Sequence, residues 1–451
     1  MILRCQIARW YLISVLSLIP FFSDLHGKEP LNLLFIAIDD MNNWVNAWGG
    51  QAITPNIDRL AREGIQFRNA HCVSPACNPS RTALLTGQRP ETTGQFDNPT
   101  NFRDKPGGLD RITLPQFLMA RGYETVSAGK VFHKQRGLGQ NPLPMSDPVS
   151  WSFQWKGPIG TTGIERYRDK DGHGAWLEGA DSFEGLPIVS YIRDSDVWGP
   201  IDLPKEECGD WQMAEFCARY LKEDHEKPFF LACGIFRPHS PQLAPREYFD
   251  LYPPESIQMP DSPEPDMVDI PPSARTNFST GYARLLRAKG MWRTAVRAYL
   301  ACMSFADDCV GLVIDALEES QYRDNTVVVF WSDHGWQLGH KDRWEKFTLW
   351  HQSTNAPMII RFPQMTNPVV CDTPVSYIDI YPTVLELLGY ERPEYLEGHS
   401  LMPLLRDVDV AWPYPAVVSF NQSHSVEFKH WNYILYEDGS EELYDHRSDP
   451  T

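Results

Sequence analysis

Cys77 opens the stretch "CNPSRTALLTG", residues 77–87, just where an apolar run with helical spacing begins. Pro79 suits the first turn of a helix, and Gly87 is a typical helix stop. We therefore predict Cys77 at a helix N-terminus, where the helix dipole favours negative charge by about 0.3–1 kcal/mol and activates a thiol. On these residues alone a disulfide, a metal ligand, a buried structural thiol and a reactive group all stay open.

Acidic residues lie at the ends of two apolar segments that are predicted to be buried strands. "LNLLFIAIDD" (31–40) ends in Asp39 and Asp40, and "TVVVFWSDHG" (326–335) carries Asp333 and His334. Adjacent carboxylates repel unless a cation lies between them, and hard oxygen ligands suit Ca²⁺ or Mg²⁺. A solvated pair at a strand end is the alternative interpretation.

Basic residues and histidines also lie near predicted strand ends and near Cys77. Lys130 and His133, spaced i and i+3 after another strand, reach one pocket if the turn between them is helical, although such a pair is more often a solvated patch. Arg81 is one helical turn from Cys77 and can reach it. His239 lies in "RPHSP" and Lys346 in "RWEKF"; an isolated histidine after a strand is more often structural.

The elements that must position these residues alternate between helix and strand. Helical patterns begin near Thr54, Leu114, Trp211 and Arg293, and apolar strands follow the last three of them. This alternation predicts an α/β fold with a mostly parallel sheet covered on both faces, and such sheets bind ligands at the carboxyl edge of their strands. The aperiodic stretches 139–210 and 252–277 are predicted to be functional walls or lids.

From about Ala411 the pattern changes to short alternating strands, with Asp438-Gly439 as a hairpin turn. We therefore divide the chain into a signal peptide (1–27), a catalytic domain (28–409) and a small antiparallel C-terminal subdomain (410–451). The signal peptide rests on Arg4 and Arg9 followed by an apolar stretch, residues 10–22, which is shorter than the about 20 residues that span a bilayer. We expect export to a periplasmic, extracellular or lumenal location without stable membrane insertion; a retained anchor is the alternative.

Composition narrows the function. The 451 residues carry a formal net charge of −18, which argues against general binding to nucleic acid or anionic membranes but permits an anionic substrate in a local basic cleft. The nine cysteines are scattered, so they do not form the disulfide framework of a small secreted protein. Cys208 with Cys217, or Cys302 with Cys309, would pair only if the geometry allows.

The stretch at Cys77 resembles the signature of the type I sulfatases, Cys-x-Pro-Ser-Arg followed by Leu-Thr-Gly, in which the cysteine is oxidised to formylglycine after translation. The resemblance extends over nearly the whole mature chain and is greatest to the iduronate-2-sulfatase branch. That branch has the same order of segments, namely "IAIDDMNNW", "TPNIDRLA", "NPTNFR", "GKVFHK", "FRPHSP" and "SDHGWQLGHKDRWEKF". It implies an alkaline phosphatase-like fold. Because relatives usually continue beyond the Asp-Pro at 449–450, we expect the C-terminal subdomain to be truncated.

The resemblance also implies the site. One divalent ion, Ca²⁺, would be held by Asp39, Asp40, Asp333, His334 and the modified Cys77. Imidazole suits zinc better than calcium, so another divalent metal stays open. Arg81, Lys130 and Lys346 would spread the charge of the sulfuryl oxygens. His239 or Lys346 would protonate the leaving oxygen, and His133 would assist release of sulfate.

The implied function is hydrolysis of a sulfuric ester on a sulfated sugar or polysaccharide, with a 2-O-sulfated uronic acid as the expected substrate and a formylglycine-generating enzyme as maturation partner. Arg103 or Lys134 could meet the uronate carboxylate, and aromatic rings could stack on sugar faces, namely Trp336, Trp344, Phe102, Trp151 and Trp155. Core filling is the alternative for at least half of the tryptophans. The rival functions are a phosphonate monoester or phosphodiester hydrolase with the same nucleophile, and an unactivated carbohydrate-binding homologue.

Overall fold

A computed structural model of the chain describes residues 30–133, 146–158, 198–260, 269–275, 282–363, 365 and 367–449. The predicted signal peptide and Lys134 lie outside these residues. No helix within the described ranges combines the length and the apolar character that crossing a membrane requires.

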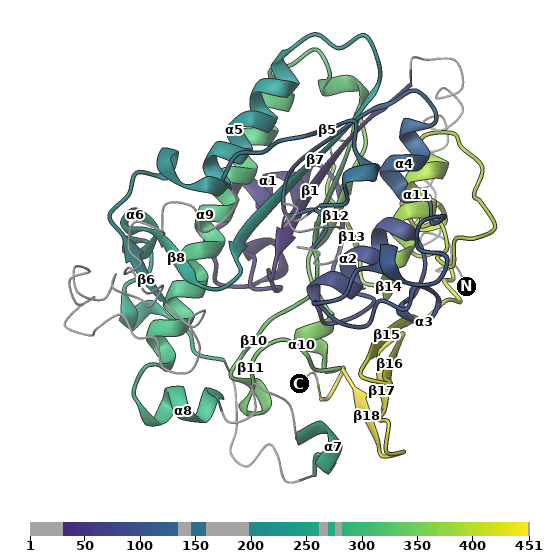
Figure 1. The fold of residues 1–451 in the computed structure, drawn as a ribbon. Helices are drawn as coiled ribbons and strands as arrows, with labels where there is room; N and C mark the ends of the chain where they lie inside the picture. The colour runs from purple at the N-terminus through teal and green to yellow at the C-terminus, as the bar shows by residue number, and fades with distance from the viewer. Residues whose placement is uncertain are drawn as a thin grey trace, which may run out of the picture.

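An eight-stranded sheet forms the centre of the molecule (Figure 1). Its strands, in spatial order, are β13 (Val369–Cys371), β2 (Ile65–Phe67), β12 (Met358–Arg361), β9 (Thr326–Ser332), β1 (Asn32–Asp39), β7 (Phe229–Pro238), β4 (Glu124–Gly129) and β5 (Phe153–Gln154). Only β12 runs antiparallel to its neighbours among these strands. The predicted mostly parallel sheet is therefore confirmed, with one reversed strand.

The strands alternate their side chains between two apolar layers, as the period of two requires. Leu34, Ile36 and Ile38 of β1 face the layer covered by helices α1 (Pro55–Arg62), α5 (Gly209–Lys222) and α9 (Trp292–Glu318). Leu33 and Phe35 face the layer covered by α2 (Cys77–Thr86), α4 (Leu114–Met119) and α11 (Ile380–Leu387). Figure 1 shows the two groups of helices on opposite faces of the sheet.

The C-terminal unit is a four-stranded antiparallel sheet of β15 (Ala416–Phe420), β16 (Ser423–Phe428), β17 (Trp431–Leu435) and β18 (Glu441–Asp445). Gly439, at φ 82°, provides the left-handed position of the predicted hairpin turn. The Ser419 N–H donates to the Val73 carbonyl at 2.9 Å, which joins this sheet to the loop before α2.

The other α-helices and strands of the described ranges are short. They are β3 (Ala70–His71), α3 (Pro90–Thr93), β6 (Trp198–Ile201), β8 (Gln242–Pro245), α6 (Arg246–Asp250), α7 (Pro272–Arg275), α8 (Tyr282–Ala288), β10 (Gln337–Leu338), β11 (Trp344–Glu345), α10 (His351–Thr354), β14 (Val375–Ser376) and α12 (Met402–Arg406). The eight cysteines in the described ranges are buried and free, so neither Cys208 with Cys217 nor Cys302 with Cys309 forms a disulfide.

Four neighbouring parallel strands, β9, β1, β7 and β4, end at the same edge of the sheet. Asp39 is the last residue of β1, and Asp333, His239 and Lys130 follow β9, β7 and β4 directly. Because all four strands point the same way, the topology brings polar residues from distant parts of the sequence to one place.

We predict that Phe35→Ala destabilises the protein by about 3–5 kcal/mol, the usual cost of emptying a buried phenylalanine site. Phe35 is fully buried in the middle of β1, with its ring centroid 4.9 Å from that of Phe230 and 6.4 Å from that of Trp331. Urea unfolding measures the change in free energy. Leu443→Ala, at an exposed position of β18, is the control. Equal losses for the two variants would contradict this account of the core.

Candidate active site

Two consecutive aspartates reach the same point because the backbone turns between them. Neighbouring side chains of a strand normally point to opposite faces. Asp40, however, has φ 67°, an uncommon left-handed conformation for a residue other than glycine. Its N–H donates to Asp333 Oδ1 at 3.0 Å, and its carbonyl accepts from the Tyr299 hydroxyl at 2.6 Å. These contacts from β9 and α9 hold the strained residue in place.

Cys77 is the first residue of α2, as predicted from the sequence, and its side chain is fully buried. Its Sγ lies 4.0 Å from Asp40 Oδ1 and 3.4 Å from His334 Nε2. The Ser80 hydroxyl, in the first turn of the helix, donates to the Asp333 carbonyl at 2.5 Å and ties α2 to the end of β9.

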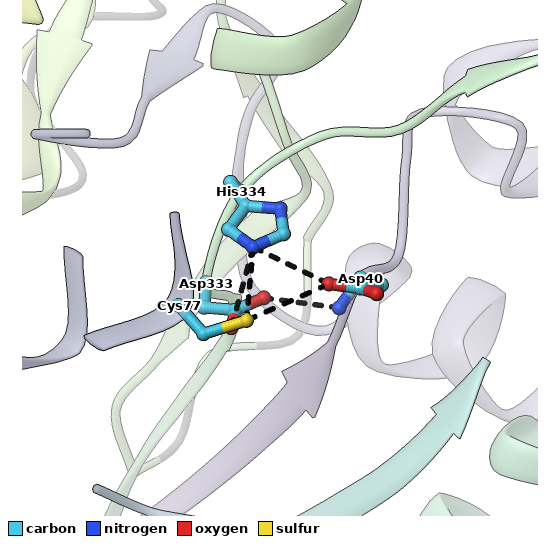
Figure 2. Close-up of side chains that lie close together, drawn as sticks. All are labelled: Asp40, Cys77, Asp333 and His334. Atoms are coloured by element: carbon cyan, nitrogen blue, oxygen red, sulfur yellow. Dashed lines mark hydrogen bonds and ion pairs between the residues drawn. The ribbon is translucent and has the colours of Figure 1, made fainter. Parts of the chain in front are cut away.

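Ligand-type atoms of four residues lie within 4.8 Å of one another, namely those of Asp40, Cys77, Asp333 and His334 (Figure 2). His334 donates from Nδ1 to the Gly335 carbonyl at 2.9 Å, which leaves Nε2 facing the other three. Its Nε2 is 3.3 Å from Asp40 Oδ1 and 3.6 Å from Asp333 Oδ2. The cluster unites β1, α2 and the end of β9.

Three cationic side chains surround the carboxylates. Lys130 pairs with Asp39, and Lys346 donates to Asp40 Oδ1 at 2.5 Å and to Cys77 Sγ at 3.1 Å. Arg81 binds Asp333 Oδ2 at 2.9 Å and Asp39 Oδ1 at 3.2 Å. Its remaining N–H groups donate to the carbonyls of Ile38, Lys130 and Val131. All five donors of Arg81 are thus engaged, so it braces the carboxylates rather than contacting Cys77 directly.

These charges perturb the titration of the buried groups. Burial, with the nearby Asp333 and Cys77, raises the pKa of Asp39 well above its usual value, although Lys130 opposes this. Burial alone would raise the pKa of the Cys77 thiol, but Lys130 and Lys346 lower it well below its usual value. Burial would lower the pKa of Lys346, but Asp40 and Cys77 raise it, so Lys346 remains an ammonium. Such opposed shifts in one buried cluster are typical of functional sites.

Two further histidines border the cluster. His239 donates from Nδ1 to the Ser240 carbonyl at 2.6 Å, and its Nε2 lies 3.7 Å from Asp40 Oδ2. Burial lowers the pKa of His239 and that of His133, which faces Cys77. A helical turn was expected between Lys130 and His133. The structure corrects this, because the segment that joins them is not helical.

Lys346, which the "RWEKF" stretch indicated, reaches the site from a segment whose strained backbone was not predicted from the sequence. Four residues near it have positive φ, namely Lys341, Asp342, Glu345 and Phe347. Left-handed conformations at such residues cost free energy and persist only where surrounding contacts fix them. One such contact is the Phe347 N–H, which donates to the Pro75 carbonyl at 3.2 Å, in the loop just before Cys77.

The structure does not bring Arg103 to the cluster, which corrects its expected contact with a substrate carboxylate. Its guanidinium is buried and binds Asp147 Oδ2 at 2.6 Å and Gln116 Oε1 at 2.8 Å, so its charge is already balanced inside the protein.

The predicted aromatic platforms are also corrected at four of the five positions, because those rings fill the core. Trp336, Trp344, Phe102 and Trp151 are buried, and Trp155 is partly buried against Phe216. Trp336 stacks on Tyr299, with ring centroids 5.9 Å apart, and Lys346 Nζ lies 5.5 Å from its ring centroid. Trp336 therefore packs against Tyr299 and Lys346 next to the site. Tyr299, which holds Asp40, was not identified from the sequence because nothing distinguishes it from other core residues of α9.

Known proteins are similar to this chain in sequence and in fold. A family model described as "Sulfatase" matches residues 31–390, and one described as "N-sulphoglucosamine sulphohydrolase, C-terminal" matches residues 339–451. A sulfatase of Formosa agariphila is 37% identical over 93% of this chain and 81% of its own length. Human iduronate 2-sulfatase is 31% identical over 84% of this chain and 68% of its own length.

Solved structures share the fold at lower identity. A phosphonate monoester hydrolase from Silicibacter pomeroyi superposes with a TM-score of 0.74 at 21% identity, covering 92% of this chain and 89% of that one. A structure described as a 2-O GAG sulfatase has a TM-score of 0.67 at 22% identity, covering 94% and 86%. The fold alone therefore does not separate the two chemistries. Because the sulfatase model matches most of its length and two sulfatases exceed 30% identity over more than four fifths of it, this chain belongs to the sulfatase family.

Proposed function

We propose that the protein is a sulfatase that hydrolyses the sulfate ester of a sulfated sugar, with a 2-O-sulfated uronic acid as its substrate. The observation that carries this proposal is the contact of the Cys77 side chain with Lys346 and His334 beside three buried carboxylates. The similarity to human iduronate 2-sulfatase supports the choice of sugar.

The buried carboxylates fit a divalent cation. Asp39, Asp40 and Asp333 are fully buried within one site, and Asp40 Oδ2 has no hydrogen-bond partner among the described residues. With His334 and the group at position 77, they offer the oxygen-rich donor set that Ca²⁺ prefers, although imidazole would also suit zinc. Cys77 Sγ stands in for the oxygens of formylglycine. Calcium would supply positive charge to the sulfuryl group, and formylglycine would supply a hydrated aldehyde as the nucleophile.

The remaining residues have separate tasks in this proposal. Lys346 and Lys130 present ammonium groups to the sulfuryl oxygens, whose charge grows in the transition state. Arg81 is a positioning residue because its five donors hold Asp39, Asp333 and neighbouring carbonyls. His239 presents Nε2 and, once protonated, gives its proton to the departing sugar oxygen. His133 moves a proton at the group on position 77 during release of sulfate.

The substrate proposal predicts faster sulfate release from an oligosaccharide ending in a 2-O-sulfated uronic acid than from one with the same backbone sulfated at a glucosamine 6-position. Ion chromatography measures the released sulfate. An aryl phosphodiester distinguishes the rival reaction: a kcat/KM higher on it than on the matched aryl sulfate would replace the sulfatase proposal.

Peptide mass analysis of the protein used in the sulfate-release assay tests whether Cys77 is converted to formylglycine. Conversion to formylglycine removes H₂S and adds one oxygen atom. An unmodified cysteine in protein from the native host, without sulfate release, would favour the carbohydrate-binding alternative.

Lys346→Met is predicted to lower kcat on an aryl sulfate by about 100-fold to 1,000-fold, the typical loss for one donor to a developing anion. Methionine keeps much of the side-chain volume but removes the charge. Lys222→Met is the control because Lys222 is an exposed lysine paired with Glu319. A loss below tenfold for Lys346→Met in folded protein would exclude Lys346 from charge stabilisation.

His239→Ala is predicted to reduce kcat/KM more on a sugar sulfate than on a nitrophenyl sulfate. A sugar alkoxide needs a proton as it departs, whereas a nitrophenolate leaves without one. Steady-state kinetics with both substrates measure the difference. Equal losses on the two substrates would argue that His239 has no role toward the leaving group.

A further inference from the structure

A second cluster of metal-ligand side chains lies where the C-terminal sheet meets the catalytic body. His71 is the last residue of β3, His351 begins α10, Glu427 is on β16, and His446 directly follows β18. None of the four belongs to the active-site cluster, and the sequence motifs did not identify them.

Their ligand atoms converge on the Glu427 carboxylate. His71 Nδ1 is 3.9 Å and His351 Nδ1 is 3.5 Å from Glu427 Oε1, while His446 Nε2 is 3.4 Å from Oε2. Atoms of His71, His351 and Glu427 lie within 4.8 Å of one another. In a tetrahedral zinc site with bonds of about 2.0–2.1 Å, neighbouring ligand atoms are about 3.3 Å apart. The three imidazole nitrogens lie 3.4–3.9 Å from the Glu427 carboxylate oxygens, which is close to that spacing.

The burial of the cluster suits a bound ion. The side chains of His71 and Glu427 are almost fully buried, whereas those of His351 and His446 keep 27% and 16% of their surface exposed. A buried carboxylate needs a compensating positive charge. The two partly exposed imidazoles leave a path by which an ion can enter.

Hydrogen bonds around His71 orient the ring as a ligand. Its Nε2 lies 2.7 Å from Asn69 Oδ1, which also accepts from Asn355 Nδ2 at 3.3 Å. Asn69 Oδ1 is therefore an acceptor, which assigns the His71 proton to Nε2 and leaves the lone pair of Nδ1 directed toward Thr354 and Glu427. An outer hydrogen bond of this kind fixes the tautomer of metal-binding histidines.

We propose that His71, His351, Glu427 and His446 bind one divalent d-block metal ion, with zinc as the expected occupant. Three imidazoles and one carboxylate form a donor set typical of zinc and related metals rather than of calcium. The ion would join β3, α10 and the C-terminal sheet, and would fasten β16 and the residue after β18 to β3. The site is structural, because all four positions are occupied by protein ligands.

The test uses the full chain, purified without a histidine tag. Elemental analysis is expected to find one equivalent of a d-block metal per chain. After chelation, calorimetric titration with ZnCl₂ in excess Ca²⁺ is expected to show a site that Glu427→Gln and His351→Ala each weaken by more than about tenfold, since even outer partners of metal ligands are worth that much. Co²⁺ in this site should give the intense visible absorption of four-coordinate cobalt.

Two controls separate this site from others. Asp333→Asn alters the active-site cluster and should leave the zinc titration and the cobalt spectrum intact. His424→Ala removes a half-exposed histidine from the same strand as Glu427 and should do likewise. The proposal is overturned if wild-type protein binds no zinc, if Asp333→Asn abolishes all zinc binding, or if Glu427→Gln binds zinc as tightly as the wild type. The wild-type and Asp333→Asn titrations decide the question even if Glu427→Gln does not fold.

Discussion

The carboxylates of Asp39, Asp40 and Asp333 are buried in one small site, where water cannot screen their repulsion. Two like charges 4 Å apart repel by about 4 kcal/mol even at an effective dielectric constant of about 20. Arg81, Lys130 and Lys346 offset this repulsion, because each of them contacts at least one of these carboxylates. A charge network of this kind contributes little net stability, because desolvation offsets much of the attraction. The gathering of these charged side chains at one edge of the sheet is therefore better explained by a functional role than by a contribution to stability.

The rest of the fold provides the rigidity that this network requires. β1 and β9 pair in parallel along almost their whole length, so their ends deliver Asp39 and Asp333 side by side. The start of α2 is tied to the same edge through Ser80 and Arg81. Strained backbone at Asp40 and around Lys346 is tolerated because the packed layers on both faces of the sheet stabilise the fold.

Local pattern predicted the elements and the residues at their ends. Alternating helix and strand periodicity gave the mostly parallel sheet, and the helix-start signals around Pro79 placed Cys77 correctly. Because Asp39 and Asp333 each lie at the end of a predicted strand, both were expected at the same edge of the sheet. The reversed direction of β12 was not predicted, because a four-residue apolar strand carries no signal for orientation.

Residues that depend on distant partners were harder to interpret. The sequence does not reveal that Arg103 is neutralised by Asp147, which lies 44 residues away, so an internal ion pair was taken for a substrate contact. Trp336 was expected to face a sugar, yet it is buried against Tyr299. A large aromatic ring suits core packing as well as sugar binding, so the residue type alone does not distinguish the two. The cluster of His71, His351, Glu427 and His446 has no short spacing that a motif could capture.

The loop that precedes Cys77 connects the two clusters. Residues 72–76 join His71 to Cys77, and this loop is held from two sides by hydrogen bonds. Val73 accepts from Ser419 of β15, and Pro75 accepts from Phe347, the neighbour of Lys346. The C-terminal sheet is therefore part of the wall that fixes Cys77, even though none of its residues enters the active-site cluster. Fastening that sheet at His71 would act on the same loop, and a shift of about 1 Å in a reacting group is enough to cost two orders of magnitude in rate.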